Sequence, residues 1–149
     1  MSTKKLVTPL LFVGVFAVGF LAGSASNPHV ASVAHAQAPA RVFELRTYTS
    51  HEGRLADVVN RFRDHTMRIF EKHGMTNVGY WVPQDAPLAP NTLIYIIAHP
   101  SREAATRNWN EFRNDPEWKT ARAASEANGP IVAKTQSVFM DATGFSPLK

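Results

Sequence analysis

Residues 41–49 read Arg-Val-Phe-Glu-Leu-Arg-Thr-Tyr-Thr, and this stretch decides the fold because its side chains alternate strictly in character. An alternation with a period of two predicts a β-strand with two unlike faces. One face carries Phe43, Leu45 and Thr47, and the other carries Glu44, Arg46 and Tyr48. We expect the apolar face to pack under helices, and we expect the polar face to carry the function.

The composition of the chain excludes several classes of site. There are 149 residues, which suits one domain, and no cysteine, which excludes disulfides and cysteine-based metal or redox centres. Outside Lys4 and Lys5, the basic residues outnumber the acidic residues by only 14 to 12, and no cluster of basic residues is present. Nucleic acid is therefore not predicted as a partner.

The first 36 residues have the pattern of a signal peptide. Lys4 and Lys5 precede an apolar run over residues 6–22, and small and polar residues then lead to Ala34-His35-Ala36. We predict cleavage after Ala36, a disordered segment over residues 37–40, and export to the periplasm or the medium, without membrane contact after cleavage. The alternative is an uncleaved N-terminal helix that anchors the protein, although the apolar run is shorter than the roughly 20 residues that span a bilayer.

The rest of the chain alternates between strand and helix patterns. A helix is predicted over residues 54–73, where apolar residues recur on one side and Gly74 follows the last turn. Its charged side is predicted to be exposed and to hold the ion pairs Asp57–Arg61 and Asp64–Arg68. Further helices are predicted over 102–113, after the N-cap Ser101, and over 116–128, after the N-cap Asp115. The remaining strands are predicted at residues 76–82, 92–98 and 134–141, and residues 142–149 form a tail.

This order, β-α-β-β-α-β, predicts an α+β ferredoxin-like sandwich over residues 41–141, with an antiparallel sheet of strand order 4-1-3-2. Right-handed crossovers put both helical segments on one face of the sheet. The other face would expose apolar residues of the central strands, so we expect two copies to pair through it as a dimeric α/β barrel. A homodimer is therefore the predicted assembly.

The sequence resembles the NIPSNAP family of dimeric α/β-barrel proteins over residues 42–141. The motifs that carry the resemblance are Phe43-Glu44-Leu45-Arg46-Thr47-Tyr48, Gly53, His73-Gly74, Gly79-Tyr80-Trp81, Tyr95-Ile96-Ile97, Trp109-x-x-Phe112 and Asp115-Pro116-Glu117-Trp118. The resemblance implies the ferredoxin-like fold and the barrel dimer. It implies little about activity, because the family has no agreed biochemical function. The wider superfamily includes cofactor-free monooxygenases and heme-binding proteins, which is an analogy at the level of the fold.

The predicted ligand-binding residues are Glu44, Arg46, Tyr48, Trp81 and Tyr95. Arg46 would bind a carboxylate or an enolate, and Tyr48 would donate a proton. The alternative is that Glu44 and Arg46 pair with each other, or across the dimer, and have only a structural role.

Glu44 and His99 are the candidate catalytic residues, because either could abstract a proton if its pKa lay near the working pH. The alternative for His99 is a turn residue before Pro100. His73 is expected to cap the C-terminus of its helix. His65 and His73 are eight residues apart and do not share a helix face, so we predict no metal site, and we predict no cofactor.

Three functions follow from these residues. The first is the binding of a small, partly apolar or anionic molecule in a dimeric barrel. The second is a cofactor-independent oxygenase or isomerase that uses the same site, and the third is a structural or protein-interaction module.

Overall fold

The computed structural model describes residues 41–149, so the predicted signal peptide and residues 37–40 lie outside the described part of the chain. Along the chain the elements are β1 (Val42–Ser50), α1 (Leu55–Arg61), η1 (Phe62–Thr66), α2 (Met67–Lys72), β2 (Thr76–Trp81), β3 (Thr92–His99), α3 (Arg102–Asn114), α4 (Pro116–Ser125) and β4 (Val132–Asp141). The predicted order of strands and helices is confirmed, including the break between α3 and α4.

The four strands form one antiparallel sheet in the order β2-β3-β1-β4, which confirms the predicted topology. β1 lies in the interior of the sheet because it pairs with β3 on one side and with β4 on the other. Arg46, at the middle of β1, lies opposite Tyr95 of β3 and Ser137 of β4. The stretch that decided the fold is therefore flanked by strands on both sides.

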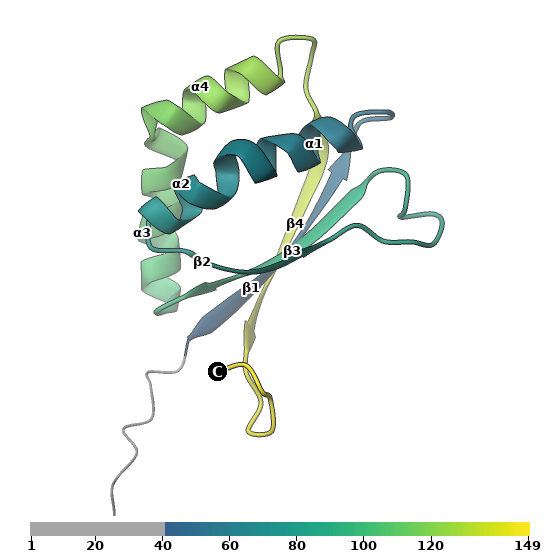
Figure 1. Cartoon of the computed structure of the whole chain (residues 1–149). Helices are drawn as coiled ribbons and strands as arrows, with labels where there is room; N and C mark the ends of the chain where they lie inside the picture. Colours follow the sequence, from purple (N-terminus) through teal and green to yellow (C-terminus); the bar gives the residue numbers. More distant parts are fainter. Residues whose placement is uncertain (1–40) are drawn as a thin grey trace, which may run out of the picture. The chain divides into compact units, whose positions relative to one another are not determined.

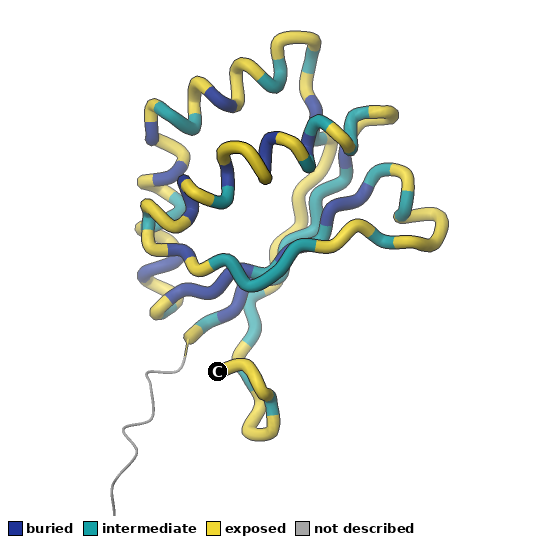
Figure 2. The backbone as a smooth tube through the Cα atoms, viewed as in Figure 1, coloured by how far each residue is buried: buried dark blue, intermediate teal, exposed yellow. Residues whose placement is uncertain are grey.

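All of the helices cover the same face of the sheet (Figure 1). The core between the two layers consists of buried side chains from the first helix, the turn after it, β3, α3 and the segment before β4. Its members are Val58, Phe62, Ile69, Phe70, Met75, Leu93, Tyr95, Ile97, Phe112 and Ile131. Figure 2 shows that the buried positions of the helices lie on the side toward the sheet, whereas β4 is largely exposed.

The predicted helix over residues 54–73 is present but contains a π-helical turn, η1, between α1 and α2. The backbone N–H of Met67 bonds to the carbonyl of Phe62, five residues back, and the hydroxyl of Thr66 donates to the carbonyl of Arg61. The wider turn shifts the residues before it relative to those after it. Arg61, which the helical wheel placed on the exposed side, is buried and only 4% exposed.

The prediction of ion pairs within this helix was wrong. The sequence suggested that Asp57 pairs with Arg61 and that Asp64 pairs with Arg68, four residues later in each case. In the structure, the partners are Arg54 for Asp57, Arg63 for Asp64, Glu126 for Arg61 and Glu117 for Arg68. The last two pairs join this helix to α4, which the spacing within one helix could not reveal.

Asp115 joins the two helical segments. Its carboxylate accepts the backbone N–H of Glu117 at 2.7 Å and so caps α4, as predicted. The same carboxylate lies 2.7 Å from Nε2 of His73 and 2.7 Å from Nζ of Lys72. Bonds from Lys72 and His73 hold the pKa of Asp115 well below its usual range. His73 therefore does more than cap its own helix, because it links the end of α2 to the start of α4.

The assignment of the two faces of β1 was wrong. We expected Phe43 and Leu45 to lie under the helices, but the helix-covered face carries Glu44, because Trp109 of α3 donates a hydrogen bond to it. Alternation shows that two residue sets lie on opposite faces, but it does not show which set faces the helices. Buried charges are accommodated there because they are paired and hydrogen-bonded.

The opposite face of the sheet is open and mainly apolar. Cross-strand neighbours share a face, so Leu45 lies beside Ile96 and Val138, and Trp81 lies beside Ile94. Val138 is 55% exposed and Trp81 is 51% exposed. The tail reaches the end of this face, where Leu148 and Ser146 share a cavity with Phe43 and Met140. Among residues 41–149, no helix is long and apolar enough to cross a membrane.

Candidate functional site

Glu44 is the centre of a buried polar cluster between the sheet and α3. Its Oε1 accepts hydrogen bonds from Nη1 of Arg46 and from Oγ of Ser137, both at 2.6 Å. Its Oε2 accepts from Nε1 of Trp109 at 2.7 Å and is bonded to Nε2 of His99 at 3.1 Å. The carboxylate is only 1% exposed, and each of its oxygens has two partners.

These partners fix the charge of Glu44. Burial raises the pKa of Glu44, but hydrogen bonds from His99, Ser137, Trp109 and Arg46 outweigh burial and lower the pKa to about 2. The carboxylate is therefore ionised at neutral pH and accepts every bond, including the one from Nε2 of His99. A carboxylate with so low a pKa is a weak base near neutral pH. The geometry favours Glu44 as the residue that orients its partners.

Arg46 is the side chain that Glu44 orients. Its guanidinium lies 4.3 Å from the ring centre of Trp109 and 5.6 Å from that of Tyr48. Nη1 is bonded to Glu44, whereas the other edge, formed by Nε and Nη2, has no hydrogen-bond partner among residues 41–149. That edge is the fork that binds a carboxylate or a phosphate through two parallel hydrogen bonds.

A cavity of 470 Å³ opens beside this cluster, with β1 and β4 on one side and α3 and α4 on the other. Its charged lining consists of Glu44 and four arginines, Arg46, Arg102, Arg113 and Arg122. Its aromatic lining consists of Tyr48, Trp109, Phe112, Trp118 and Phe139. We call this cavity the cleft. Because its charge is strongly positive and its walls are aromatic, it suits an anion with an apolar body.

The structure brings together some of the predicted site residues. Glu44, Arg46 and Tyr48 line the cleft together. Tyr95 lies on the same face of the sheet, but it is fully buried beside Tyr48, with ring centres 5.4 Å apart, and it does not line the cleft. Trp81 lies on the open face, with its ring against Gly79, and is not part of this site.

The candidate base His99 is completely buried under the cluster. Its Nε2 is bonded to Glu44, and its Nδ1 has no partner among the described residues. Its ring is 6.2 Å from that of Phe139, which lines the cleft. His99 therefore helps to hold the carboxylate of Glu44 in place through this bond, and it is more than a turn residue before Pro100. No group of three or more metal-ligating side chains occurs in the described part of the chain.

Sequence reasoning missed the residues that complete the site. Ser137 was not singled out, although its position opposite Arg46 on β4 follows from the strand register. Trp109 packs on Phe70 and Phe112, and its indole nitrogen donates a hydrogen bond to Glu44, which its place in an apolar helix stripe did not indicate. Arg102, which lies over the ring of Phe139, was also missed. The sequence could have indicated Arg102, because this residue lies in the first turn of α3, shortly after the end of β3.

Comparison with protein families gives one clear result. The model of the NIPSNAP family matches residues 43–147, which is most of the chain and includes all the described strands and helices except the first residue of β1. A comparison with curated proteins finds no match.

Solved structures with the same fold come from several bacteria. A NIPSNAP family protein of unknown function from Agrobacterium tumefaciens superposes with a TM-score of 0.64 at 21% identity, covering 76% of this chain and 97% of that one. An uncharacterised NIPSNAP-like domain protein from Burkholderia xenovorans has a TM-score of 0.63 at 18% identity, covering 73% and 90%. A monooxygenase from Streptomyces coelicolor, in complex with nanaomycin D, has a TM-score of 0.53 at 14% identity, covering 76% and 96%. These likenesses concern the fold.

Proposed function

The chain belongs to the NIPSNAP family, and from this premise we propose that its cleft binds a small organic anion with an aromatic or otherwise apolar body. The proposal rests on the orientation and the unpaired hydrogen-bond donors of Arg46. Its guanidinium is fixed at the cleft by the ionised Glu44 and by the ring of Trp109, and its bidentate edge is left without a protein partner.

Energetic reasons favour a ligand at this edge. The side chain of Arg46 is 15% exposed, and a guanidinium that is mostly removed from water and only partly hydrogen-bonded is costly. A bound carboxylate would supply the missing acceptors. The aromatic walls would bury the apolar body of the ligand, which adds about 25 cal/mol for each Å² removed from water. The anionic group gives orientation, and the apolar body adds affinity.

The same contacts make proton abstraction by Glu44 the less favoured function. All four hydrogen bonds to its oxygens would have to be rearranged before it could accept a proton from a substrate. His99 is fully buried, so a substrate has no access to its free nitrogen without movement of the sheet or of α3. We therefore assign both residues to the positioning of Arg46.

We further propose that the open face of the sheet closes against a second copy of the chain. Leu45, Ile96 and Val138 form a row across three strands of this face, and Val138 is more than half exposed. A contiguous apolar sheet face of this kind is typical of an interface. In this assembly the clefts lie on the helix side of each copy, away from the interface.

Export is proposed on the sequence of residues 1–36 alone, and the alternative is retention by an uncleaved N-terminal helix. N-terminal sequencing of the protein recovered from the producing cells distinguishes the two. A mature chain that begins at Gln37 supports cleavage, and an intact N-terminus supports the anchor.

The binding proposal is tested by titrating biphenyl-4-carboxylate into the wild-type chain and into Arg46→Lys in a calorimeter. Lysine keeps the charge beside Glu44 but lacks the planar fork. We expect saturable binding to the wild type and about tenfold weaker binding to the variant, since tenfold corresponds to one lost hydrogen bond to a charged group. The matched control is Arg107→Lys on the exposed side of α3, which does not line the cleft. Equal affinities for wild type and Arg46→Lys would contradict the proposal.

A further inference from the structure

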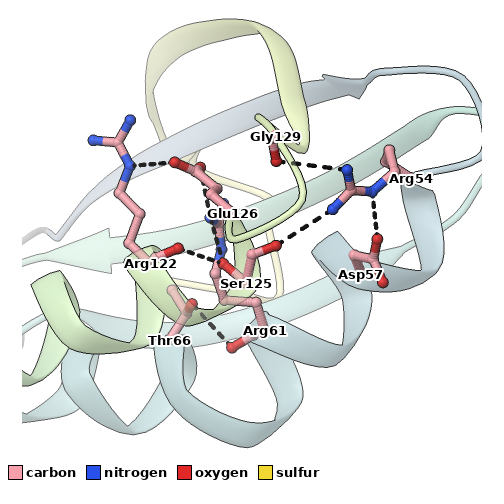
Figure 3. Close-up of polar contacts among 8 residues, drawn as sticks. All are labelled: Arg54, Asp57, Arg61, Thr66, Arg122, Ser125, Glu126 and Gly129. Carbon is pink, nitrogen blue, oxygen red and sulfur yellow. Dashed lines mark hydrogen bonds and ion pairs between the residues drawn. The ribbon is translucent and has the colours of Figure 1, made fainter.

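Arg61, the last residue of α1, is a buried arginine that faces the end of α4. Nη1 of Arg61 donates to Oγ of Ser125 at 3.2 Å and to Oε1 of Glu126 at 3.0 Å (Figure 3). Only 3% of its side chain is exposed. Oε2 of the same glutamate accepts a bond from Nε of Arg122 at 3.0 Å, so a single carboxylate serves two arginines. Arg61 and Arg122 therefore share one carboxylate, which neutralises only one of their two charges.

The surroundings of Arg61 repeat those of Arg46. Each guanidinium lies over a tryptophan ring, at 4.3 Å for Arg46 over Trp109 and at 5.1 Å for Arg61 over Trp118. Each is bonded through Nη1 to a glutamate. In each, the buried Nε has no hydrogen-bond partner among residues 41–149, and no bond from Nη2 is formed there either. Each guanidinium is therefore oriented by a glutamate and a tryptophan, and the described residues supply no acceptor for its bidentate edge.

The two forks lie in adjoining cavities. Arg61 lines a cavity of 290 Å³ that shares Tyr48, Trp118 and Arg122 with the cleft. Two of these three shared side chains, Tyr48 and Trp118, are aromatic and border both cavities. Taken together, five arginines and two glutamates line the two cavities, so a single anionic group leaves the lining positive.

We propose that the ligand of this cleft is a dianion in which a planar or apolar body separates two carboxylate or phosphate groups, one bound by Arg46 and the other by Arg61 with Arg122. This inference rests on the proposed function, because it takes the Arg46 site as the first anchor. It adds a second anchor and therefore a ligand class. The body of the ligand would lie along Tyr48 and Trp118, and the second anionic group would compete with Glu126 for the arginines at that end.

The test compares acids that differ only in the second anionic group. Biphenyl-4-carboxylate and biphenyl-4,4′-dicarboxylate are titrated into the wild-type chain, together with the shorter pair benzoate and terephthalate. In at least one of the two pairs, we expect the diacid to bind at least about tenfold more tightly than the matching monoacid. This is the gain expected for one additional charge-assisted interaction.

Two variants locate the second anchor. Arg61→Lys keeps the buried charge opposite Glu126 but lacks the fork, and we expect it to reduce the diacid advantage while leaving monoacid affinity unchanged. Because a change at a buried residue can impair folding, Arg122→Gln at an exposed position supplies an independent variant, which should also reduce the ratio of diacid to monoacid affinity. The ratio is compared, and not the monoacid affinity, because Arg122 also lines the cleft. Arg107→Gln is the matched control on α3 and should leave the ratio of diacid to monoacid affinity at its wild-type value.

The outcomes separate this inference from the proposed function. If the monoacids bind and the diacids bind no more tightly at either length, the second anchor is refuted and the Arg46 site stands. If a diacid advantage survives in both Arg61→Lys and Arg122→Gln, the second anchor is placed wrongly and the inference fails. If neither class of acid binds the wild type, both proposals fail.

Discussion

The indole nitrogen of Trp109 donates a hydrogen bond of 2.7 Å to Oε2 of Glu44, and this bond joins α3 to the central strand β1. The two residues are 65 positions apart in the sequence. Through this bond the helix layer holds the carboxylate that orients Arg46. The position of the guanidinium at the cleft therefore depends on how α3 packs on the sheet.

Replacing Trp109 by phenylalanine should destabilise the protein, because a buried ionised acceptor loses one of its donors. Hydrogen bonds to charged groups contribute about 1.5–3 kcal/mol, so we expect a loss of this size in the free energy of unfolding measured by urea denaturation. The matched control is Trp118→Phe, since the indole nitrogen of Trp118 makes no hydrogen bond within residues 41–149. Equal losses in the two variants would contradict the assigned role of Trp109.

Stability should fall in acid because of Glu44. Its pKa is about 2 in the folded protein, against an ordinary value of 4.5, so its contribution is fully present above pH 4.5 and is lost as the pH falls toward 2. A shift of that size corresponds to about 3 kcal/mol. The pKa can be read directly from the ¹³C chemical shift of the Glu44 carboxyl during an NMR titration. A midpoint near 4.5 would show that the four hydrogen bonds do not favour the ionised form.

Affinity for biphenyl-4-carboxylate should be independent of pH between about 5 and 9, because neither Arg46 nor the Glu44 that orients it changes its charge in this range. The low pKa of Glu44 keeps it ionised. Burial lowers the pKa of Arg46, but the combined effect of Tyr95, Tyr48 and the bonded Glu44 is larger and raises it. The pKa of Arg46 therefore lies above its usual range. Calorimetry at several pH values provides the measurement. A midpoint near pH 6.5 would instead indicate that an imidazole takes part in binding.

The open face of the sheet should determine the oligomeric state. We expect the wild type to be a dimer by light scattering, and we expect Val138→Asp to be a monomer, because a carboxylate would be buried without a partner at the interface. Ala123→Asp, at an exposed position on α4, is the control and should remain a dimer. The monomeric variant should still bind biphenyl-4-carboxylate, since the cleft lies on the other face. A wild type that is monomeric at all concentrations would contradict the dimer proposal.

The fold could be predicted from the sequence because each element has a local signal. The alternation in β1, the apolar stripe of the first helix, and the caps Ser101 and Asp115 gave the element order, and the order gave the sheet topology. The π-helical turn could not be predicted, because a period of 3.6 residues was assumed throughout the helix. The burial of Arg61 could not be predicted either, because the side chains that it contacts, Ser125, Glu126 and Trp118, belong to α4 and the residue after it.

The site could be predicted only in part. Glu44, Arg46 and Tyr48 were identified because three polar groups on one strand face are conspicuous. The face that they occupy could not be deduced, since β3 is apolar on both sides and gives no preference. The partners of Glu44 come from α3, β3 and β4, and only tertiary packing brings them together. Trp81 was included because it is an aromatic residue beside the proline-rich loop that could stack on a ligand, and it lies on the other side of the sheet.

The three tryptophans of the chain provide the most direct test of the central claim, because Trp109 and Trp118 line the cleft and Trp81 lies on the open face. Each indole N–H gives one resolved signal in a ¹H–¹⁵N correlation spectrum, which can be followed while biphenyl-4-carboxylate is added to the wild-type chain. We predict that the signals of Trp109 and Trp118 move with one common saturation curve and that the signal of Trp81 stays in place. A response of Trp81 alone, or no response from any of the three, would contradict ligand binding between the sheet and the helices.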